Sequence, residues 1–416
     1  MARTERRVVV TGLGLVTPLG NTLQSNLDAL MTGRSGIGPI THFDASEFPS
    51  RIAGEVRDFD PGDFIEKKEI KKMDGFIHYA VAAAQMAVDD ATFRVDAAEA
   101  ERVGVLVGVG MGGIATVEEY VEAYLKHGLK RVSPFFIPRL IANLAPGNIA
   151  IRFGLKGMNY APASACASGG HAIGEAFRLI RFGYQDAMLA GGSEAAVTPL
   201  GVGGFAVMRA LSTRNEEPQR ASRPFDRTRD GFVIAEGAGV LVLESLERAQ
   251  QRGARIYAEI VGYGANADAY HITTPSPDGQ GATRCMQLAL EDGAIDPLAV
   301  DYINAHGTST PYNDATETKA IKRVFGEHAA RLAVSSTKSL TGHLLGAGGA
   351  VEAAYTALAL HHQRIPPTWN YSERDPECDL DYVPNQPRDA ALRVALSNSF
   401  GFGGANVCLA LQRWTQ

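Results

Sequence analysis

A lone cysteine stands among very small residues in the sequence ASACASGG, residues 163–170. A helix is expected to follow over residues 171–182. A cysteine at such a tight turn exposes its sulfur, and the N–H groups at the start of a helix stabilise a thiolate. The pattern predicts that Cys166 is a nucleophile of lowered pKa, suited to acyl transfer. The alternative is a small buried cysteine packed between glycines.

Three further polar segments follow expected strands. They are residues 304–310, NAHGTST, residues 336–343, STKSLTGH, and residues 398–406, NSFGFGGAN. Because α/β enzymes place reacting groups where strands end, these segments are candidates to share a site with Cys166. Taken singly, His306 and His343 also fit ordinary turn residues. Lys338 also fits a surface lysine or an ion pair with Glu352.

Common cofactor and metal motifs are missing from the sequence. No G-x-G-x-x-G opens a helix after a strand, and there is no G-x-x-x-x-G-K-[ST] phosphate loop. The cysteines form no C-x-x-C pair; they are Cys166, Cys285, Cys378 and Cys408. The adjacent histidines at 361–362 lack a matching carboxylate pattern. We therefore expect neither a nucleotide cofactor nor a required metal.

Apolar runs ending in glycine alternate with alanine-rich helical patterns, which predicts α/β layers. We expect the chain to turn after the strand at residues 7–12 and again at residues 191–193, after the strand at residues 186–190. The expected strands are residues 7–12, 103–109, 186–190, 240–243, 256–264, 301–305, 332–336, 391–398 and 405–411. The expected helices are residues 26–31, 74–91, 171–182 and 344–360. The runs VVVTGLG and IYAEIVGYG share a pattern of apolar residues followed by glycine, so we expect two similar halves. Residues 1–250 would carry the nucleophilic cysteine, and residues 251–416 both histidines and the glycine loop.

The composition excludes several classes of protein. The chain has 416 residues, 45% of them hydrophobic, and a formal net charge of −6. This mild acidity argues against a nucleic-acid binder. No stretch is long and apolar enough to span a bilayer, and the β-branched, glycine-rich N-terminus fits a strand better than a signal peptide. Few cysteines suit a reducing cytosol, so we expect a cytoplasmic protein, although their even number leaves a disulfide open.

In this order, the four segments resemble those of the β-ketoacyl-acyl carrier protein synthases of the thiolase superfamily, most closely the type II enzymes of bacterial fatty-acid elongation. The resemblance covers essentially the whole chain, from VVVTGLG to GFGGANVCLAL. It includes GVGGFAVMRALSTRN at residues 201–215 and RPFDRTRDGFVIAEGAG at residues 223–239. It implies an α/β thiolase-like fold, a five-layered αβαβα sandwich, and a homodimer.

The resemblance also implies a decarboxylative Claisen condensation. Cys166 would take an acyl chain from an acyl carrier protein, and malonyl-acyl carrier protein would lose carbon dioxide and attack the acyl-cysteine. His306 and His343 would stabilise the enolate as neutral N–H donors. The backbone N–H groups of Cys166 and Phe402 would hold the acyl oxyanion, and Lys338 would act electrostatically and structurally. No cofactor is implied, because the carrier protein brings the pantetheine arm.

Further residues match substrate and partner contacts by the same resemblance. Thr308 and Thr310 would meet the pantetheine amides, and Phe402 with Phe400 would gate the acyl tunnel. The tunnel lining, for which plain core packing is the alternative, would comprise Met111, Ala165, Ala196 and Phe205. The basic residues suited to an acidic carrier protein, or to a solvated helix face, are Lys67, Lys68, Lys71, Lys72, Lys130 and Arg131. A monovalent cation could be held by Asn304, Glu352, Ser397 and Asn398.

Related activities stand as alternatives. A biosynthetic thiolase needs a second cysteine, but Cys408 lies inside an expected strand rather than at a loop tip. A starter-type synthase uses a Cys-His-Asn set, whereas GHLLG supplies a second histidine here. The main competitor is a polyketide-type ketosynthase that works with a partner subunit. A non-condensing chain-length subunit would have lost the nucleophile, and Cys166 argues against it.

Overall fold

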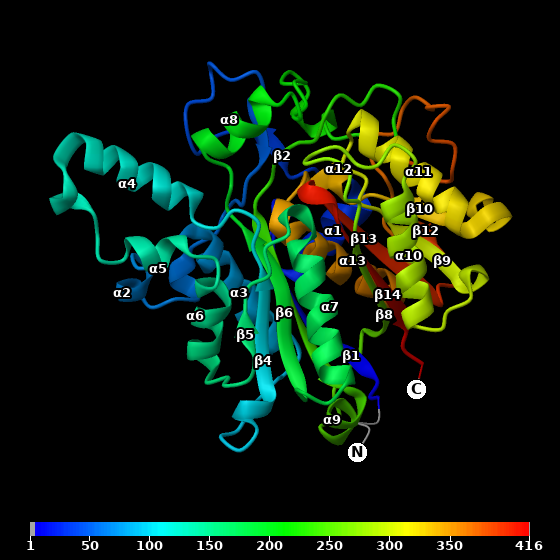
Figure 1. The fold of residues 1–416 in the computed structure, drawn as a ribbon, viewed down its shortest axis with the longest axis horizontal. Coiled ribbons are helices and arrows are strands. Elements are labelled where there is room, and N and C mark those ends of the chain that lie inside the picture. The colour runs from blue at the N-terminus through cyan, green and yellow to red at the C-terminus, as the bar shows by residue number, and fades with distance from the viewer. Residues whose placement is uncertain (1–4, 416) are drawn as a thin grey trace.

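The computed structural model describes residues 5–415, and its centre is a mixed ten-stranded sheet (Figure 1). From edge to edge the strands are β10 (Ala333–Ser335), β9 (Val300–Asn304), β13 (Val394–Gly401), β14 (Ala405–Arg413), β8 (Ala258–Ala267), β1 (Val8–Val16), β7 (Gly237–Ser245), β6 (Ala187–Glu194), β4 (Val103–Gly108) and β5 (Asn159–Tyr160). Two small sheets pair β2 (Ile37–Pro39) with β3 (Ile52–Gly54) and β11 (Arg364–Ile365) with β12 (Arg388–Asp389).

The two halves of the large sheet repeat one strand order. They meet where β1 and β8 pair antiparallel, with Val8 opposite Ile260 and Val10 opposite Ala258. Outwards from this junction, β1–β7–β6–β4–β5 and β8–β14–β13–β9–β10 each run through two antiparallel pairings and then two parallel ones. The similarity between VVVTGLG and IYAEIVGYG therefore reflects equivalent strands. The boundary near residue 250 stays a prediction.

Helices cover both faces of each half-sheet and give the expected five layers. The central helices are α7 (Ser168–Arg181) and α13 (Gly348–His362), and the outer ones are α3 (Gly75–Asp90) and α6 (Leu144–Phe153) on one side and α10 (Gln280–Asp292) and α11 (Pro311–Phe325) on the other. Alternate strand residues face different layers: on β7, Leu241 and Leu243 pack with the central helices, while Val240 and Val242 pack with α3 and α6. The predicted αβαβα sandwich is confirmed.

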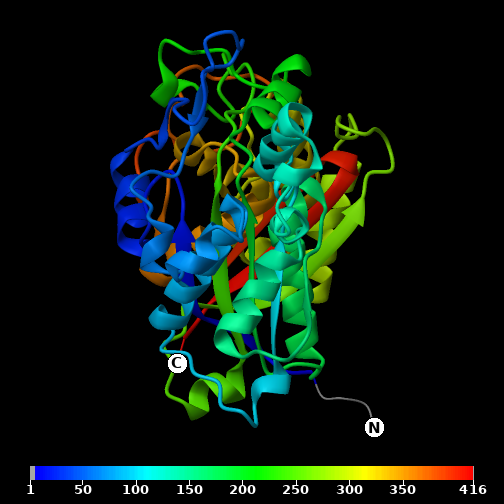
Figure 2. The same ribbon diagram turned by 90° about the vertical axis from the view of Figure 1, so that its left-hand side faces the viewer.

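Shorter elements complete the chain. The remaining helices are α1 (Leu23–Thr32), α2 (Lys67–Ile70), α4 (Ile114–His127), α5 (Phe136–Leu140), α8 (Pro199–Val207), α9 (Leu246–Gln251) and α12 (Lys338–Thr341). The 3-10 turns used below are η4 (Ala165–Ala167), η8 (Leu345–Ala347) and η9 (Phe402–Gly404). Helix α4 extends from the body in Figure 1, and the start of β1 and the end of β14 lie toward the end of the molecule opposite α8 (Figures 1 and 2). Within residues 5–415, none of the helices could cross a membrane.

Two turns expected after apolar runs are strand residues instead, so that prediction is wrong. β1 continues past its glycines to Val16, and β6 continues past its glycines to Glu194. Helix α3 lies so close to β1 that a Cβ on Gly14 would be 1.9 Å from the carbonyl oxygen of Ala83. These glycines permit close approach of backbone layers and do not turn the chain.

Substituting Gly14 tests this close packing. Gly14→Ala should lower the free energy of unfolding by about 3 kcal/mol, because the new methyl group has no space against α3. Gly204→Ala in α8 is the matched control, since no heavy atom lies within 4 Å of a Cβ there. That control should raise stability slightly, by about 0.5–1 kcal/mol, through helix propensity. Urea-induced unfolding measures both, and equal effects would contradict the packing explanation.

Candidate active site

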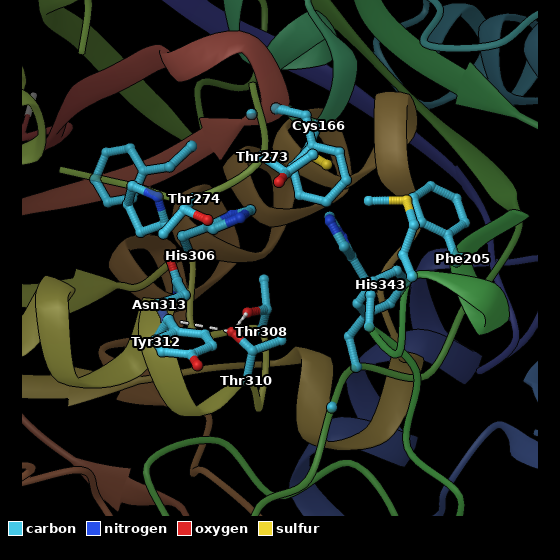
Figure 3. Close-up of a pocket in the computed structure, with 18 of the residues that line it drawn as sticks. Cys166, Phe205, Thr273, Thr274, His306, Thr308, Thr310, Tyr312, Asn313 and His343 are labelled. Carbon is cyan, nitrogen blue, oxygen red and sulfur yellow. Dashed lines mark hydrogen bonds between the residues drawn. The ribbon is translucent and has the colours of Figure 1, made fainter. Parts of the chain in front are cut away.

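One cavity brings together side chains from all four polar segments. Figure 3 shows Cys166, His306 and His343 pointing into it from three different elements. The predicted site residues that line it are Cys166, Phe205, His306, Thr308, Thr310, His343, Phe400 and Phe402. Residues more than 200 positions apart therefore form one site. Strand β13 contacts η4 and α7, and β9 and β10 are the next strands in the sheet, so the segments that follow these strands can reach the cysteine turn.

The turn that carries Cys166 is bent and firmly held. Ala165 has a φ of 50°, a left-handed conformation that is uncommon for a residue with a side chain. The buried Ser168 hydroxyl accepts the N–H of Ser164 at 2.8 Å and donates to the carbonyl of Ala165 at 2.7 Å. Helix α7 begins at Ser168, three residues earlier than the sequence predicts. The cysteine therefore directly precedes a helix, as expected.

The glycine loop reaches the cysteine through its backbone. The N–H groups of Phe402 and of Cys166 itself both point at the Cys166 sulfur. A Cβ on Gly401 would lie 2.6 Å from the carbonyl oxygen of Ser164 and 3.3 Å from the Cys166 nitrogen. Only glycine lets the loop approach this closely. Two converging N–H donors beside a nucleophile are the geometry of an oxyanion hole.

The two histidines form a close pair of neutral rings. The ring centres of His306 and His343 are 5.3 Å apart, and their planes are at 83°. Burial, together with the positive charge of Lys338, holds the pKa of both imidazoles well below the usual 6.5. The Nδ1 atoms of both rings are buried without a hydrogen-bond partner in the described structure. Neutral rings can each donate one N–H bond to a developing oxyanion.

Lys338 lies behind the histidines and does not line the cavity. It is 1% exposed and forms a buried ion pair with Glu352 of α13. Burial raises the pKa of Glu352 to about 7, although Lys338 acts in the opposite direction. A buried lysine is rarely retained without such a partner, so the pair explains how this charge can be placed in the core.

Residues named for a cation site share an unusual property. Each has a buried side-chain oxygen without a hydrogen-bond partner in the described structure; they are Asn304, Glu352, Ser397 and Asn398. The amide nitrogen of Asn304 donates to the Glu352 carbonyl at 3.2 Å, and that of Asn398 donates to Glu317 at 3.1 Å. The side-chain oxygens of both asparagines therefore have no hydrogen-bond donor in the described structure. Uncompensated buried oxygens fit a hard cation. Among residues 5–415, no cluster of three or more His, Cys, Asp or Glu residues could hold a metal.

The predicted lowering of the Cys166 pKa is wrong. Burial raises the pKa of this thiol to about 12, and the nearby Glu194 carboxylate adds to the rise. Lys338 and the N–H groups of Phe402 and Cys166 act in the opposite direction without prevailing. Removal from water therefore outweighs the stabilisation expected at a helix N-terminus. The thiol is protonated at neutral pH.

The predicted tunnel and pantetheine residues divide into two groups. The Phe205 ring lies 6.2 Å from the Phe402 ring, and the Thr308 and Thr310 hydroxyls are 2.9 Å apart at the cavity wall. Three other predicted lining residues are not among those that line the cavity: Met111, Ala165 and Ala196. Ala196 packs in the apolar cluster that contains Cys166, while Met111 is 39% exposed.

The predicted basic clusters do not line the cavity. Lys68 pairs with Glu66 and Lys72 with Glu69, which fits a solvated face as well as a docking surface. Absent from the lining are Lys67, Lys68, Lys71, Lys72, Lys130 and Arg131. Arg209, which the sequence reasoning missed, does line it. Its position in MRALSTRN at the end of α8 carries no chemical signal without the fold.

The structure also shows the state of the four cysteines. All four cysteines are free thiols. Cys408 lies within β14 and packs with α10 and α11, on the face of the sheet away from the central helices. Burial raises its pKa well above the ordinary value. A second acid–base cysteine, which a thiolase requires, is therefore not present in this cavity.

Alkylation of Cys166 tests its high pKa. Because only the thiolate reacts, the rate with iodoacetamide should rise about tenfold per pH unit between pH 7 and 9, without levelling off. Intact-mass and peptide mass spectrometry give the rate at this residue, and Cys166→Ser is the control for the buried cysteines. A plateau below pH 8 would instead indicate a thiolate stabilised at rest.

Comparison with known proteins identifies the family. Family models for the β-ketoacyl synthase N-terminal domain and C-terminal domain match residues 5–249 and 257–372. The chain is 56% identical over 415 residues to 3-oxoacyl-[acyl-carrier-protein] synthase 2 of Synechocystis sp., with 100% of both chains covered. Identity to the synthase 2 of Vibrio harveyi is 50% over 411 residues, 99% of each chain.

Solved structures agree with the sequence relatives. A β-ketoacyl synthase from Burkholderia phymatum superposes with a TM-score of 0.92 at 39% identity, covering 99% of this chain and 100% of that one. A ketosynthase solved in complex with its type II polyketide acyl-carrier protein gives a TM-score of 0.90 at 37% identity, covering 99% and 100%. These matches confirm the resemblance seen in the sequence: the chain belongs to the β-ketoacyl synthase family.

Proposed function

We propose that this chain is a type II β-ketoacyl-acyl carrier protein synthase that elongates fatty acyl chains by two carbons. The observation that carries the proposal is the meeting of Cys166, two neutral histidines and the Phe402 N–H in one cavity. A nucleophile, an oxyanion hole and a second pair of N–H donors are what a two-step condensation needs.

The first step transfers the acyl chain to the enzyme. Cys166 attacks the carbonyl carbon of an acyl-carrier thioester, and the N–H groups of Cys166 and Phe402 hold the resulting oxyanion. The carbon–sulfur bond to pantetheine then breaks, and the thiol proton of Cys166 goes to the departing pantetheine sulfur. An acyl-cysteine remains, which makes the kinetics ping-pong.

The second step uses the histidine pair. Malonyl-carrier protein binds with its thioester oxygen between His306 and His343. Loss of carbon dioxide leaves the electron pair as an enolate, whose oxygen accepts both imidazole N–H bonds. The enolate carbon attacks the acyl-cysteine carbonyl, and the carbon–sulfur bond to Cys166 breaks. The β-ketoacyl chain stays on the carrier protein, and the Cys166 thiolate takes a proton from water to restore the thiol. The low pKa values of the imidazoles keep both rings neutral, so each ring can donate an N–H bond to the enolate oxygen.

Two observations favour fatty-acid elongation over the polyketide alternative. Identity to synthase 2 proteins is 49–56%, against 37–38% to the polyketide-type ketosynthases among the solved structures. Cys166 is in place, which argues against a non-condensing chain-length subunit. The four free cysteines suit the cytoplasm, a reducing compartment.

An acyl carrier protein and a second copy of this chain are the proposed partners. Threonine hydroxyls at the cavity wall suit pantetheine amides, and Arg209 with the basic clusters suits an acidic carrier. For the homodimer, strand β5 is an unpaired sheet edge flanked by exposed apolar side chains. Those between residues 111 and 160 are Met111, Val121, Tyr124, Leu125, Leu129, Phe135, Ile137, Ile141, Ile151, Met158 and Tyr160.

A monovalent cation bound by the four unpartnered oxygens is also part of the proposal. The residues that would hold it are Asn304, Glu352, Ser397 and Asn398. Bound there, it would supply a partner for the Glu352 oxygen that Lys338 does not contact and would join β9 to β13. Its role would be to order the strand end from which His306 projects.

Two single substitutions test the proposed roles. Cys166→Ala should abolish acyl loading, because no other thiol reaches the cavity. His343→Ala should leave acyl loading within about tenfold of normal but reduce carbon dioxide release at least about 100-fold, through the loss of one oxyanion donor. Intact-mass spectrometry measures loading, and labelled malonyl-carrier protein measures decarboxylation. An acylated Cys166→Ala protein, or normal decarboxylation by His343→Ala, would refute the assignment.

Thermal unfolding tests the cation. At equal ionic strength, potassium or sodium chloride should raise the melting temperature by a few degrees over choline chloride, since binding stabilises the folded state. Ser397→Ala should reduce this difference, while Ser245→Ala, on the same sheet but far from the four oxygens, should not. An identical melting temperature in all three salts would remove the cation from the proposal.

A further inference from the structure

Glu194, at the end of β6, is a buried carboxylate that the mechanism above does not use. It is fully buried, and no lysine, arginine or histidine side chain of residues 5–415 forms an ion pair with it. Its oxygens instead accept four backbone N–H groups, from Gly110 at 2.9 Å, Met111 at 3.0 Å, Gly346 at 3.1 Å and Gly112 at 3.3 Å. The donors come from both halves of the molecule.

The two turns that Glu194 joins lie against the nucleophile. A Cβ on Gly110 would be 3.5 Å from the carbonyl oxygen of Ala165, the residue before the cysteine. Leu345, next to Gly346, has a φ of 49° and lines the cavity beside Cys166. Leu345 is thus part of an apolar wall of the cavity next to the sulfur. By binding the N–H groups of both turns, the carboxylate fixes the position of this wall relative to the sulfur.

The four donors explain why a carboxylate stands here. They bind both oxygens: Met111 and Gly112 donate to Oε1, and Gly110 and Gly346 to Oε2. A neutral amide has one acceptor oxygen and would place an NH₂ group against the other donors. Burial raises the pKa of this carboxyl to about 7, and the four N–H groups act in the opposite direction.

We propose that Glu194 is a positioning residue of the acyl-binding site. It fastens the Gly110–Gly112 turn to Gly346 and so fixes the wall that an acyl chain on Cys166 meets. This role rests on the proposed function.

The experiment compares Glu194→Gln with Glu194→Asp. Glutamine removes the charge and places an NH₂ group against backbone donors, whereas aspartate keeps the charge but withdraws it from the turns. Glu55→Gln is the matched control, because Glu55 is a buried carboxylate that accepts the N–H groups of Thr41 at 2.7 Å and His42 at 3.0 Å away from the cavity. Acyl loading is measured by intact mass with carrier substrates of several chain lengths.

Both Glu194 variants should change the ratio of loading rates between the longest and shortest accepted chains by about tenfold, because small displacements of a wall next to the reacting atom are costly. Glu55→Gln should leave that ratio unchanged. The ratio of the Cys166 alkylation rates with N-dodecylmaleimide and N-ethylmaleimide should change as well, since the long reagent meets the same wall without any carrier protein.

A wild-type chain-length profile in the Glu194 variants would overturn the positioning role, and this holds even if only the aspartate variant folds. If the wild type accepts no acyl chain at all, the proposed function fails. The ratio of the two maleimide rates would then still decide the role of Glu194, and an unchanged ratio would overturn it.

Discussion

The buried ion pair between Lys338 and Glu352 is the interaction on which the chemistry of this site depends. Its positive end adds to burial in lowering the pKa of His306 and His343, and it partly offsets the burial that raises the pKa of Cys166. Two imidazoles that stay neutral can donate N–H bonds to an enolate, whereas charged rings would bind the malonyl carboxylate and oppose its loss. A lysine that does not line the cavity thus reinforces the neutral state of both histidines.

The core around this pair is closely packed, so Lys338 can be buried there only together with its partner Glu352. Glycines at the centre of the molecule let backbone meet backbone where side chains would prevent it, as at Gly14 against α3 and Gly401 against the cysteine turn. Dense packing excludes water and makes each electrostatic interaction stronger. Because water is excluded, the pKa of the Cys166 thiol is also raised, and the thiol stays protonated until a thioester binds.

The two equivalent halves carry different chemistry at equivalent positions. Each has a 3-10 turn followed by a central helix, η4 before α7 and η8 before α13. The first turn contains Cys166, and the second contains Gly346, whose N–H binds Glu194. One half therefore supplies the nucleophile and the other the histidines, and the site exists only where they meet.

The sequence alone determined the family, the α/β layers and most of the candidate residues that meet in the cavity, because short motifs such as ASACASGG and GFGGAN are required by local backbone geometry and are specific in their order. It also indicated the second histidine and excluded Cys408 as a catalytic thiol. The two similar halves could be recognised in the sequence only from the weak similarity between VVVTGLG and IYAEIVGYG. Strands can share one order in the sheet without sharing side chains.

Only the tertiary structure decided the protonation states and the connections between distant residues. The Cys166 pKa was predicted in the wrong direction, because a motif shows the helix that follows but not the depth of burial. The prediction of turns at the glycines of β1 and β6 was wrong for a similar reason. These glycines let another segment of backbone approach closely, and the local sequence does not show which segment that is. Glu194 and Arg209 carry no signal in their segments, since their importance comes from what folding places beside them.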